Sequence, residues 1–202
     1  MSSFFLSSLD ELSSVLASCA ALETAVTAAG RAILDCLVGG RTILTCGNGG
    51  SAADALHLSE ELVGRYKADR RALSAICLNA DVTALTCIGN DYGYDHVFSR
   101  QVEALGRPGD VLVGFSTSGN SPNVLGAFRR AKEMGLVTIF LGGKDGGLAK
   151  GFCAHEIIVP SFTTRGFRKF ALWCCINGWK SSRTSIGRQS PRPPRGVRDL
   201  LR

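Results

Sequence analysis

Residues 110–121 read DVLVGFSTSGNS, in which the apolar run Asp110–Phe115 is followed directly by the hydroxyl-rich run Ser116–Ser121. The apolar run predicts a buried strand of a parallel sheet, and Pro122–Met134 predicts a helix after it. A strand, a Ser/Thr/Gly turn and a helix N-terminus in this order hold a phosphate group, because free backbone N–H groups and the positive end of the helix dipole face the anion. The segment therefore predicts an α/β domain with a phosphate site.

The flanking sequence alternates between strand and helix patterns. Further strands are predicted at 41–46, 72–78, 137–142 and 155–159, and helices at 52–66, 81–89 and 96–106. Residues 3–38 have helical periodicity with a possible break at 27–30. This order predicts a three-layer, doubly wound parallel sheet of the flavodoxin-like α/β class, preceded by N-terminal helices. Ligands bind beyond the carboxyl ends of such strands, where Gly47–Ser51 and Ser116–Ser121 both fall.

Size and composition predict one globular domain. The chain has 202 residues, and no apolar run is expected to be long enough to span a membrane. The first residues lack the basic segment of a signal peptide. The eight cysteines are scattered without a C-x-x-C pair, which favours buried thiols over disulfides or a zinc knuckle. We expect a cytoplasmic protein.

Charge is distributed unevenly along the chain. Residues 1–160 hold 13 basic and 16 acidic side chains, a net charge of −3, whereas residues 161–202 hold ten basic side chains and one acidic, a net charge of +9. A basic tail of this kind is typical of nucleic-acid binding.

The loop Gly47–Ser51 has two interpretations. A glycine-rich turn after a strand can be no more than a tight strand-to-helix connection that needs positive φ angles. It is not the dinucleotide-binding pattern, which requires glycine where Ala52 stands. Paired with the hydroxyl-rich run, a phosphate or sugar site is the better interpretation.

Two further groups of residues carry chemistry. His57 and Glu61 lie four residues apart on one predicted helix, so they share a face that can hold a divalent metal, and Glu61 can also act as a general base. The alternative is a solvated face with a simple His–Glu contact; Glu60 is expected to point elsewhere. Asn90 and Asp91 lie in a predicted loop, where they either form an Asx turn or contact a substrate. His96, His155 and the Gly142–Gly147 loop are assigned no chemistry.

These residues together resemble the phosphoheptose isomerases of the sugar isomerase (SIS) domain superfamily. The resemblance covers about residues 1–160, with residues 1–38 as an N-terminal helical oligomerisation segment. The matching stretches are Cys46–Ser51, His57–Tyr66, Gly89–Gly93, Phe98–Gly106, Gly109–Leu112, Ser116–Ser121 and Gly143–Gly147. Several long motifs in the same order make the resemblance specific.

The resemblance implies a function and a set of site residues. It implies interconversion of sedoheptulose 7-phosphate and D-glycero-D-manno-heptose 7-phosphate through an enediol, for lipopolysaccharide synthesis, in a homotetramer with active sites at subunit interfaces. Zinc, one ion per subunit, is the implied cofactor, and neither a nucleic acid nor a membrane is an expected partner. The implied phosphate contacts are Ser116, Thr117, Ser118 and Ser121; the sugar contacts are Asn48, Gly49, Gly50, Ser51, Asn90, Asp91 and Glu61; the zinc ligands are His57 and Glu61, with Glu61 also the base.

The tail departs from the family. The family ends with a helix of the form Thr-Ala-Arg-Ile-Gln-Glu-x-His and a second His, whose Gln and second His complete the metal and acid–base set. Here no His follows His155, and the only later Gln is Gln189. Two of the expected zinc ligands are therefore missing.

A frameshift explains the departure. When reading starts at the third base of codon 165, the following bases can encode Arg-Ile-Gln-Glu-Val-Arg-Ile-Val-Val-Leu-His. In that frame Trp173-Cys174 forces Val, Cys174-Cys175 forces Leu, and Cys175-Ile176 allows only His or Tyr. We therefore interpret 161–202 as an aberrant Pro/Arg/Ser-rich tail, entered near Ser161–Arg165, and expect impaired activity of this chain. The nucleotide sequence across codons 155–185 tests this hypothesis.

Three alternatives stay open from the sequence. One is a non-catalytic SIS protein that binds a protein partner, as replication-initiation regulators do. The second is a sensor of sugar phosphates, although no helix-turn-helix segment is fused to this domain. The third is an RNA-binding protein that uses the basic tail.

Overall fold

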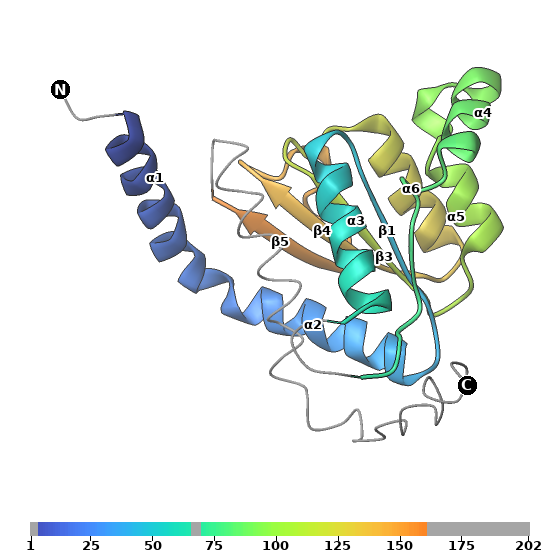
Figure 1. Cartoon of the computed structure of the whole chain (residues 1–202), viewed down its shortest axis with the longest axis horizontal. Helices are drawn as coiled ribbons and strands as arrows, with labels where there is room; N and C mark the ends of the chain where they lie inside the picture. Colours follow the sequence, from blue (N-terminus) through green and yellow to red (C-terminus); the bar gives the residue numbers. More distant parts are fainter. Residues whose placement is uncertain (1–3, 66–69, 161–202) are drawn as a thin grey trace, which may run out of the picture.

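A five-stranded parallel sheet forms the centre of the molecule. The computed structural model describes residues 4–65 and 70–160, and the strand order is β2-β1-β3-β4-β5 (Figure 1). This is the flavodoxin-like, doubly wound order, so the predicted fold class is confirmed. The strands are β1 (Ile43–Gly47), β2 (Ala75–Cys77), β3 (Val111–Ser116), β4 (Val137–Gly143) and β5 (His155–Val159).

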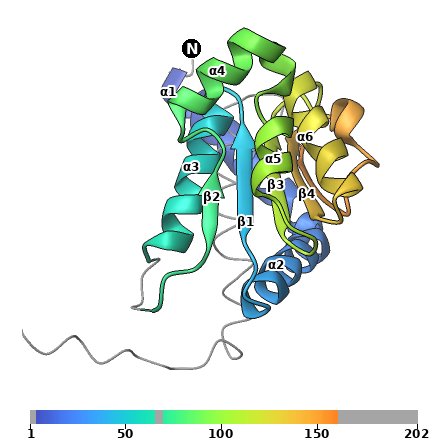
Figure 2. The same ribbon diagram turned by 90° about the vertical axis from the view of Figure 1, so that its right-hand side faces the viewer.

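Helices cover both faces of this sheet and complete three layers (Figures 1 and 2). On one face α2 and α3 bury residues such as Ile33 and Leu58 against Val111 and Val113; on the other, α5 and α6 pack against Leu112. Alternate residues of β3 thus serve opposite cores, as a pleated strand requires. The helices are α1 (Phe4–Ser18), α2 (Glu23–Val38), α3 (Gly50–Val63), α4 (Val82–Tyr92), α5 (Ser99–Leu105) and α6 (Pro122–Glu133), with short 3-10 turns at Cys19–Leu22 (η1), Tyr94–His96 (η2) and Gly147–Ala149 (η3).

Several element boundaries differ from the sequence prediction. The N-terminal helical segment changes at Cys19–Leu22 and not at 27–30, because Ala29 and Gly30 are buried in α2, where packing outweighs a glycine's low helix propensity. The edge strand β2 is shorter than the predicted 72–78. Helix α4 begins at its N-cap Asp81, whose carboxylate accepts the Ala84 N–H at 2.9 Å, and runs past the predicted end at Gly89 to Tyr92.

The N-terminal helices form the one long apolar segment in the described part of the chain. By length and composition alone, Leu6–Val38 could cross a membrane, contrary to the expectation that no segment is long enough; the difference arises because α1, η1 and α2 run on without a break. Helix α2 nevertheless contributes Ile33, Leu34 and Leu37 to the core beside the sheet. Helix α1 leaves the body of the domain (Figure 1).

The cysteines behave as predicted at most of the described positions. Cys46 and Cys77 are buried, but Cys87 lies exposed on α4. Burial raises the pKa of Cys36 to about 11 and that of Cys153 to about 12. These two thiols therefore stay protonated and unreactive near neutral pH. The tail 161–202, with the proposed frameshift, lies outside the described residues.

Candidate functional site

The two predicted ligand loops meet at one edge of the sheet. Strands β1 and β3 are neighbours, with Gly47 opposite Phe115, so Gly47–Ser51 and Ser116–Ser121 leave the sheet side by side. This is the place where the order of the strands reverses, since β1 is followed by β2 on one side and by β3 on the other. Doubly wound sheets bind their ligands at that crevice.

The first loop presents the N-terminus of α3. Gly49 is its N-cap residue with a φ of 56°, a left-handed conformation that glycine adopts without strain. The Ser51 N–H donates to the Asn48 carbonyl oxygen at 2.9 Å, which closes the turn. Asn79 bonds both backbone groups of Gly47 and holds the start of the loop.

The second loop is folded around its own hydroxyl groups. The Oγ atoms of Ser116 and Ser121 lie 3.1 Å apart, and the Gly119 N–H donates to Ser116 Oγ at 3.2 Å. Ser121 is the N-cap residue of α6, yet its side chain makes no capping hydrogen bond. The Ser121 hydroxyl bonds Ser116 Oγ and has further hydrogen-bonding capacity for a ligand beside the positive end of a twelve-residue helix.

The turn after β4 supports the hydroxyl loop. A Cβ atom on Gly119 would lie 1.8 Å from the Gly146 carbonyl oxygen, so the two backbones are in direct contact. Asn120 Oδ1 accepts the Leu148 N–H at 2.8 Å, and the Gly119 carbonyl accepts the Ala149 N–H at 3.1 Å. The segment that the sequence left without chemistry thus has a positioning role, which no local pattern reveals.

A pair of amides joins the β1 loop to the first turn of α6, directly after the hydroxyl loop. Asn48 and Asn123 exchange two hydrogen bonds, 2.8 and 2.9 Å long, and the Tyr94 hydroxyl donates to Asn48 Oδ1 at 3.1 Å. Asn123 is only 1% exposed, whereas Asn48 is partly accessible. Sequence reasoning missed Asn123 and Tyr94, because only the folded chain brings α6 and η2 to the first loop.

Asn90 and Asp91 are in the last turn of α4 and not in a loop. Both are exposed, and their side chains bond each other at 2.8 Å. Figure 2 shows α4 beyond the carboxyl end of β1. Neither side chain hydrogen-bonds Asn48 or the hydroxyl loop within residues 4–65 and 70–160, so the structure places them near this edge without joining them to it.

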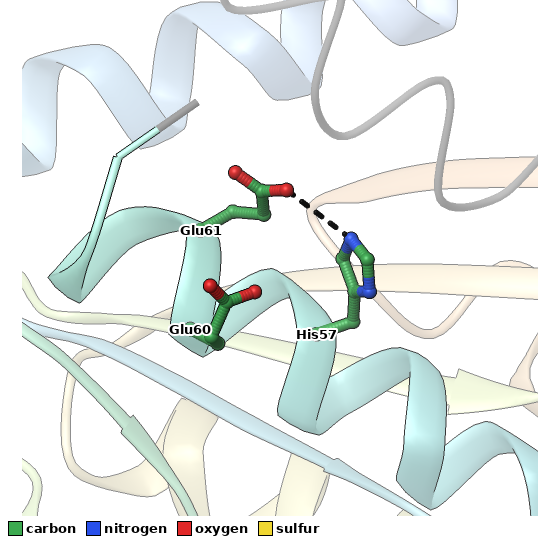
Figure 3. A group of neighbouring side chains, drawn as sticks. All are labelled: His57, Glu60 and Glu61. Carbon is green, nitrogen blue, oxygen red and sulfur yellow. Dashed lines mark ion pairs between the residues drawn. The ribbon is translucent and has the colours of Figure 1, made fainter. Parts of the chain in front are cut away.

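The third part of the predicted site lies on α3 (Figure 3). His57 Nε2 is 3.3 Å from Glu61 Oε1, with side chains 44% and 18% exposed. The other carboxylate oxygen, Glu61 Oε2, is buried without a hydrogen-bond partner in the described structure. Glu60 does not point elsewhere as expected, because one ligand atom from each of His57, Glu60 and Glu61 lies within 4.8 Å of the others. Glu61 is about 16 Å along α3 from Gly50, so one chain does not bring this group to the loops.

Comparisons with known proteins agree with this architecture. A family model described as an SIS domain matches residues 8–143. A phosphoheptose isomerase of Campylobacter jejuni is 54% identical over 143 residues, which are 71% of this chain and 77% of the relative.

Solved structures agree as well. The phosphoheptose isomerase GmhA of Neisseria gonorrhoeae is 40% identical with a TM-score of 0.82, over 88% of this chain and 95% of that one. A phosphoheptose isomerase of Francisella tularensis is 31% identical with a TM-score of 0.83, over 87% and 94% of the two chains.

Proposed function

Because the chain belongs to the phosphoheptose isomerase family of SIS-domain proteins, we propose that it interconverts sedoheptulose 7-phosphate and D-glycero-D-manno-heptose 7-phosphate. The observation that carries this proposal is the meeting of the two loops at the switch point of the sheet, joined by the Asn48–Asn123 pair. The hydroxyl loop suits a phosphate, and the β1 loop suits the hydroxyl groups of a sugar. The family relationship favours this enzyme over the partner-binding and sensor alternatives.

The hydroxyl loop binds the phosphate end of the substrate in this proposal. Ser116, Thr117, Ser118 and Ser121 supply hydroxyl groups, and the N-terminus of α6 supplies positive potential without a full charge. A preformed loop of neutral donors binds a phosphate without paying to reorganise. The contacts from the turn after β4 keep the loop in this shape.

The β1 loop binds the reacting end of the sugar. Asn48, Gly49, Gly50 and Ser51 lie beside the phosphate loop, so a ligand can touch both. Asn90 and Asp91 would reach it from the end of α4.

The α3 cluster is the proposed place for zinc and for the base. The donor set fits the ion, because an imidazole and carboxylates are zinc ligands and Glu61 Oε2 is a buried oxygen with no hydrogen-bond partner among the described residues. His57 and Glu61 would hold it, and polarisation of the sugar carbonyl is the chemistry that zinc supplies when bound. Glu61 has two carboxylate oxygens, so it can hold the ion through one and take the proton that moves between C1 and C2 with the other.

We further propose a cytoplasmic homotetramer packed through the N-terminal helices, acting in lipopolysaccharide synthesis. Exposed Leu6, Leu9 and Leu16 on α1 support a packing surface. An interface between subunits would also bring the partly exposed α3 cluster of one chain to further groups, which fits its separation from the loops of the same chain.

The test is turnover of sedoheptulose 7-phosphate by two proteins: this chain and a version with the reading frame restored from codon 161. We expect the frame-restored protein to form the aldose phosphate and this chain to be at least about 1,000-fold slower, because groups that act as a unit fail together. No turnover by the frame-restored protein would contradict the proposed function. Equal turnover by both would contradict the proposed role of the missing tail.

A further inference from the structure

The orientation of the Asn123 amide is fixed by a backbone group. The Val124 N–H donates to Asn123 Oδ1 at 3.0 Å. Since a backbone N–H can only donate, the side-chain atom it meets is the oxygen. Asn123 is buried in the first turn of α6, so this orientation is the one that its surroundings select.

That orientation sets the orientation of Asn48. Asn123 Nδ2 donates to Asn48 Oδ1 at 2.9 Å, and Asn48 Nδ2 donates one of its hydrogens to Asn123 Oδ1 at 2.8 Å. The Tyr94 hydroxyl donates to Asn48 Oδ1 at 3.1 Å. An amide oxygen has two lone pairs, so the acceptor capacity of Asn48 is filled. What Asn48 has left is one N–H, directed out of the amide pair.

We infer that Asn123 and Tyr94 are positioning residues that make Asn48 an obligate hydrogen-bond donor to a sugar oxygen. The inference rests on the proposed function and specifies how its sugar site works. Tyr94 gives its proton to Asn48, so its own oxygen is free to accept from a hydroxyl group of the substrate. Asn48 and Tyr94 then offer a donor beside an acceptor, which matches the neighbouring oxygens of a polyhydroxy chain. Inorganic phosphate has no such chain and gains nothing from the pair.

The test compares the affinities of two probes for the full chain by calorimetry: sedoheptulose 7-phosphate and inorganic phosphate. We expect Asn123→Ala to weaken the sugar ester by about tenfold and phosphate by less than about twofold, since one well-placed hydrogen bond is lost. In a chain that already carries Asn48→Ala, Asn123→Ala should have no further effect on the sugar ester, because it acts through Asn48. An equal loss in both backgrounds overturns the inference.

Tyr94→Phe provides a second variant that folding defects do not obscure, because Tyr94 is 62% exposed. It should weaken the sugar ester about threefold to tenfold and leave phosphate unchanged. Tyr92→Phe is its matched control, since Tyr92 is 52% exposed and its ring packs on Arg100. Equal effects of the two changes would contradict the role of Tyr94.

A measurement on the free protein separates this inference from the proposed function. In nuclear magnetic resonance spectra, one Nδ2 proton of Asn48 should be protected from exchange with water and the other should exchange freely. Two equally exchanging protons overturn the inference even where the sugar ester binds. Failure of the unchanged chain to bind sedoheptulose 7-phosphate, with the protected proton present, counts against the proposed function alone.

Discussion

The loop half and the helix half of the candidate site differ in how complete they are within one chain. In the loop half, the β1 and β3 loops are joined by the reciprocal amide pair and supported by the turn after β4. In the helix half, His57 and Glu61 contact each other along α3, and Glu61 Oε2 has no partner in the described structure. Under the proposed function, ligand recognition belongs to the sheet, whereas proton transfer needs groups from elsewhere.

The burial pattern of α3 explains the difference. Ala55, Leu58 and Leu62 face the core, which leaves His57 44% exposed on the solvent side of the helix and Glu61 18% exposed on its flank. Strand pairing forces the two loops together, whereas the α3 cluster within residues 4–65 and 70–160 consists of His57, Glu60 and Glu61, all from one helix. A tail helix or a second subunit would have to complete it.

The largest expected effect tests whether the two halves act separately. Glu61→Gln in the frame-restored protein should lower turnover of sedoheptulose 7-phosphate by about 100-fold to 10,000-fold, because the amide cannot accept the proton. The affinity for inorganic phosphate, measured by calorimetry, should stay within about twofold.

Glu133→Gln is the control for that change, since Glu133 is a 53% exposed glutamate at the end of α6 whose surface ion pair with Arg130 contributes little. It should leave both turnover and phosphate affinity unaltered. A large loss of phosphate affinity with Glu61→Gln would show that the halves are coupled and would break the comparison.

The next effect concerns the rigidity of the loop half. Gly119 and Gly40 have similar φ angles, 67° and 70°, but a Cβ on Gly119 would overlap the Gly146 backbone whereas a Cβ on Gly40 meets nothing. Gly40→Ala should lower the free energy of unfolding by about 1–2 kcal/mol, the cost of a left-handed alanine. Gly119→Ala should cost about 2 kcal/mol more, because the hydroxyl loop and the turn after β4 must separate. Chemical denaturation measures both; equal losses would mean that the turn after β4 does not support the loop.

The sequence predicts the frame of the site better than its contacts. The apolar run before Ser116 and the glycine-rich turn after Cys46 are local signals, and parallel topology then places both loops at one edge of the sheet. Asn123 and Tyr94 carry no local signal, because their partner Asn48 is 75 and 46 residues away in the chain. The sequence predicts Asn90 and Asp91 in a loop because it predicts a helix end at Gly89, but α4 continues to Tyr92. Glu60 shows that neighbours on a helix can still converge when their side chains are long.

The smallest expected effect tests one donor of the loop half. Ser121→Ala removes a hydroxyl that makes no capping bond, so the stability of α6 should change little, although the loop loses the contact with Ser116 Oγ. Affinity for inorganic phosphate should fall about twofold to tenfold, the value of a single neutral hydrogen bond. Ser99→Ala, outside the loop half, serves as the control, because among residues 4–65 and 70–160 its hydroxyl donates a single hydrogen bond, to the His96 carbonyl oxygen at 3.3 Å. If Ser121→Ala binds phosphate as tightly as Ser99→Ala, then the backbone and the helix dipole hold the anion, and the hydroxyl groups shape the loop instead of binding the ligand.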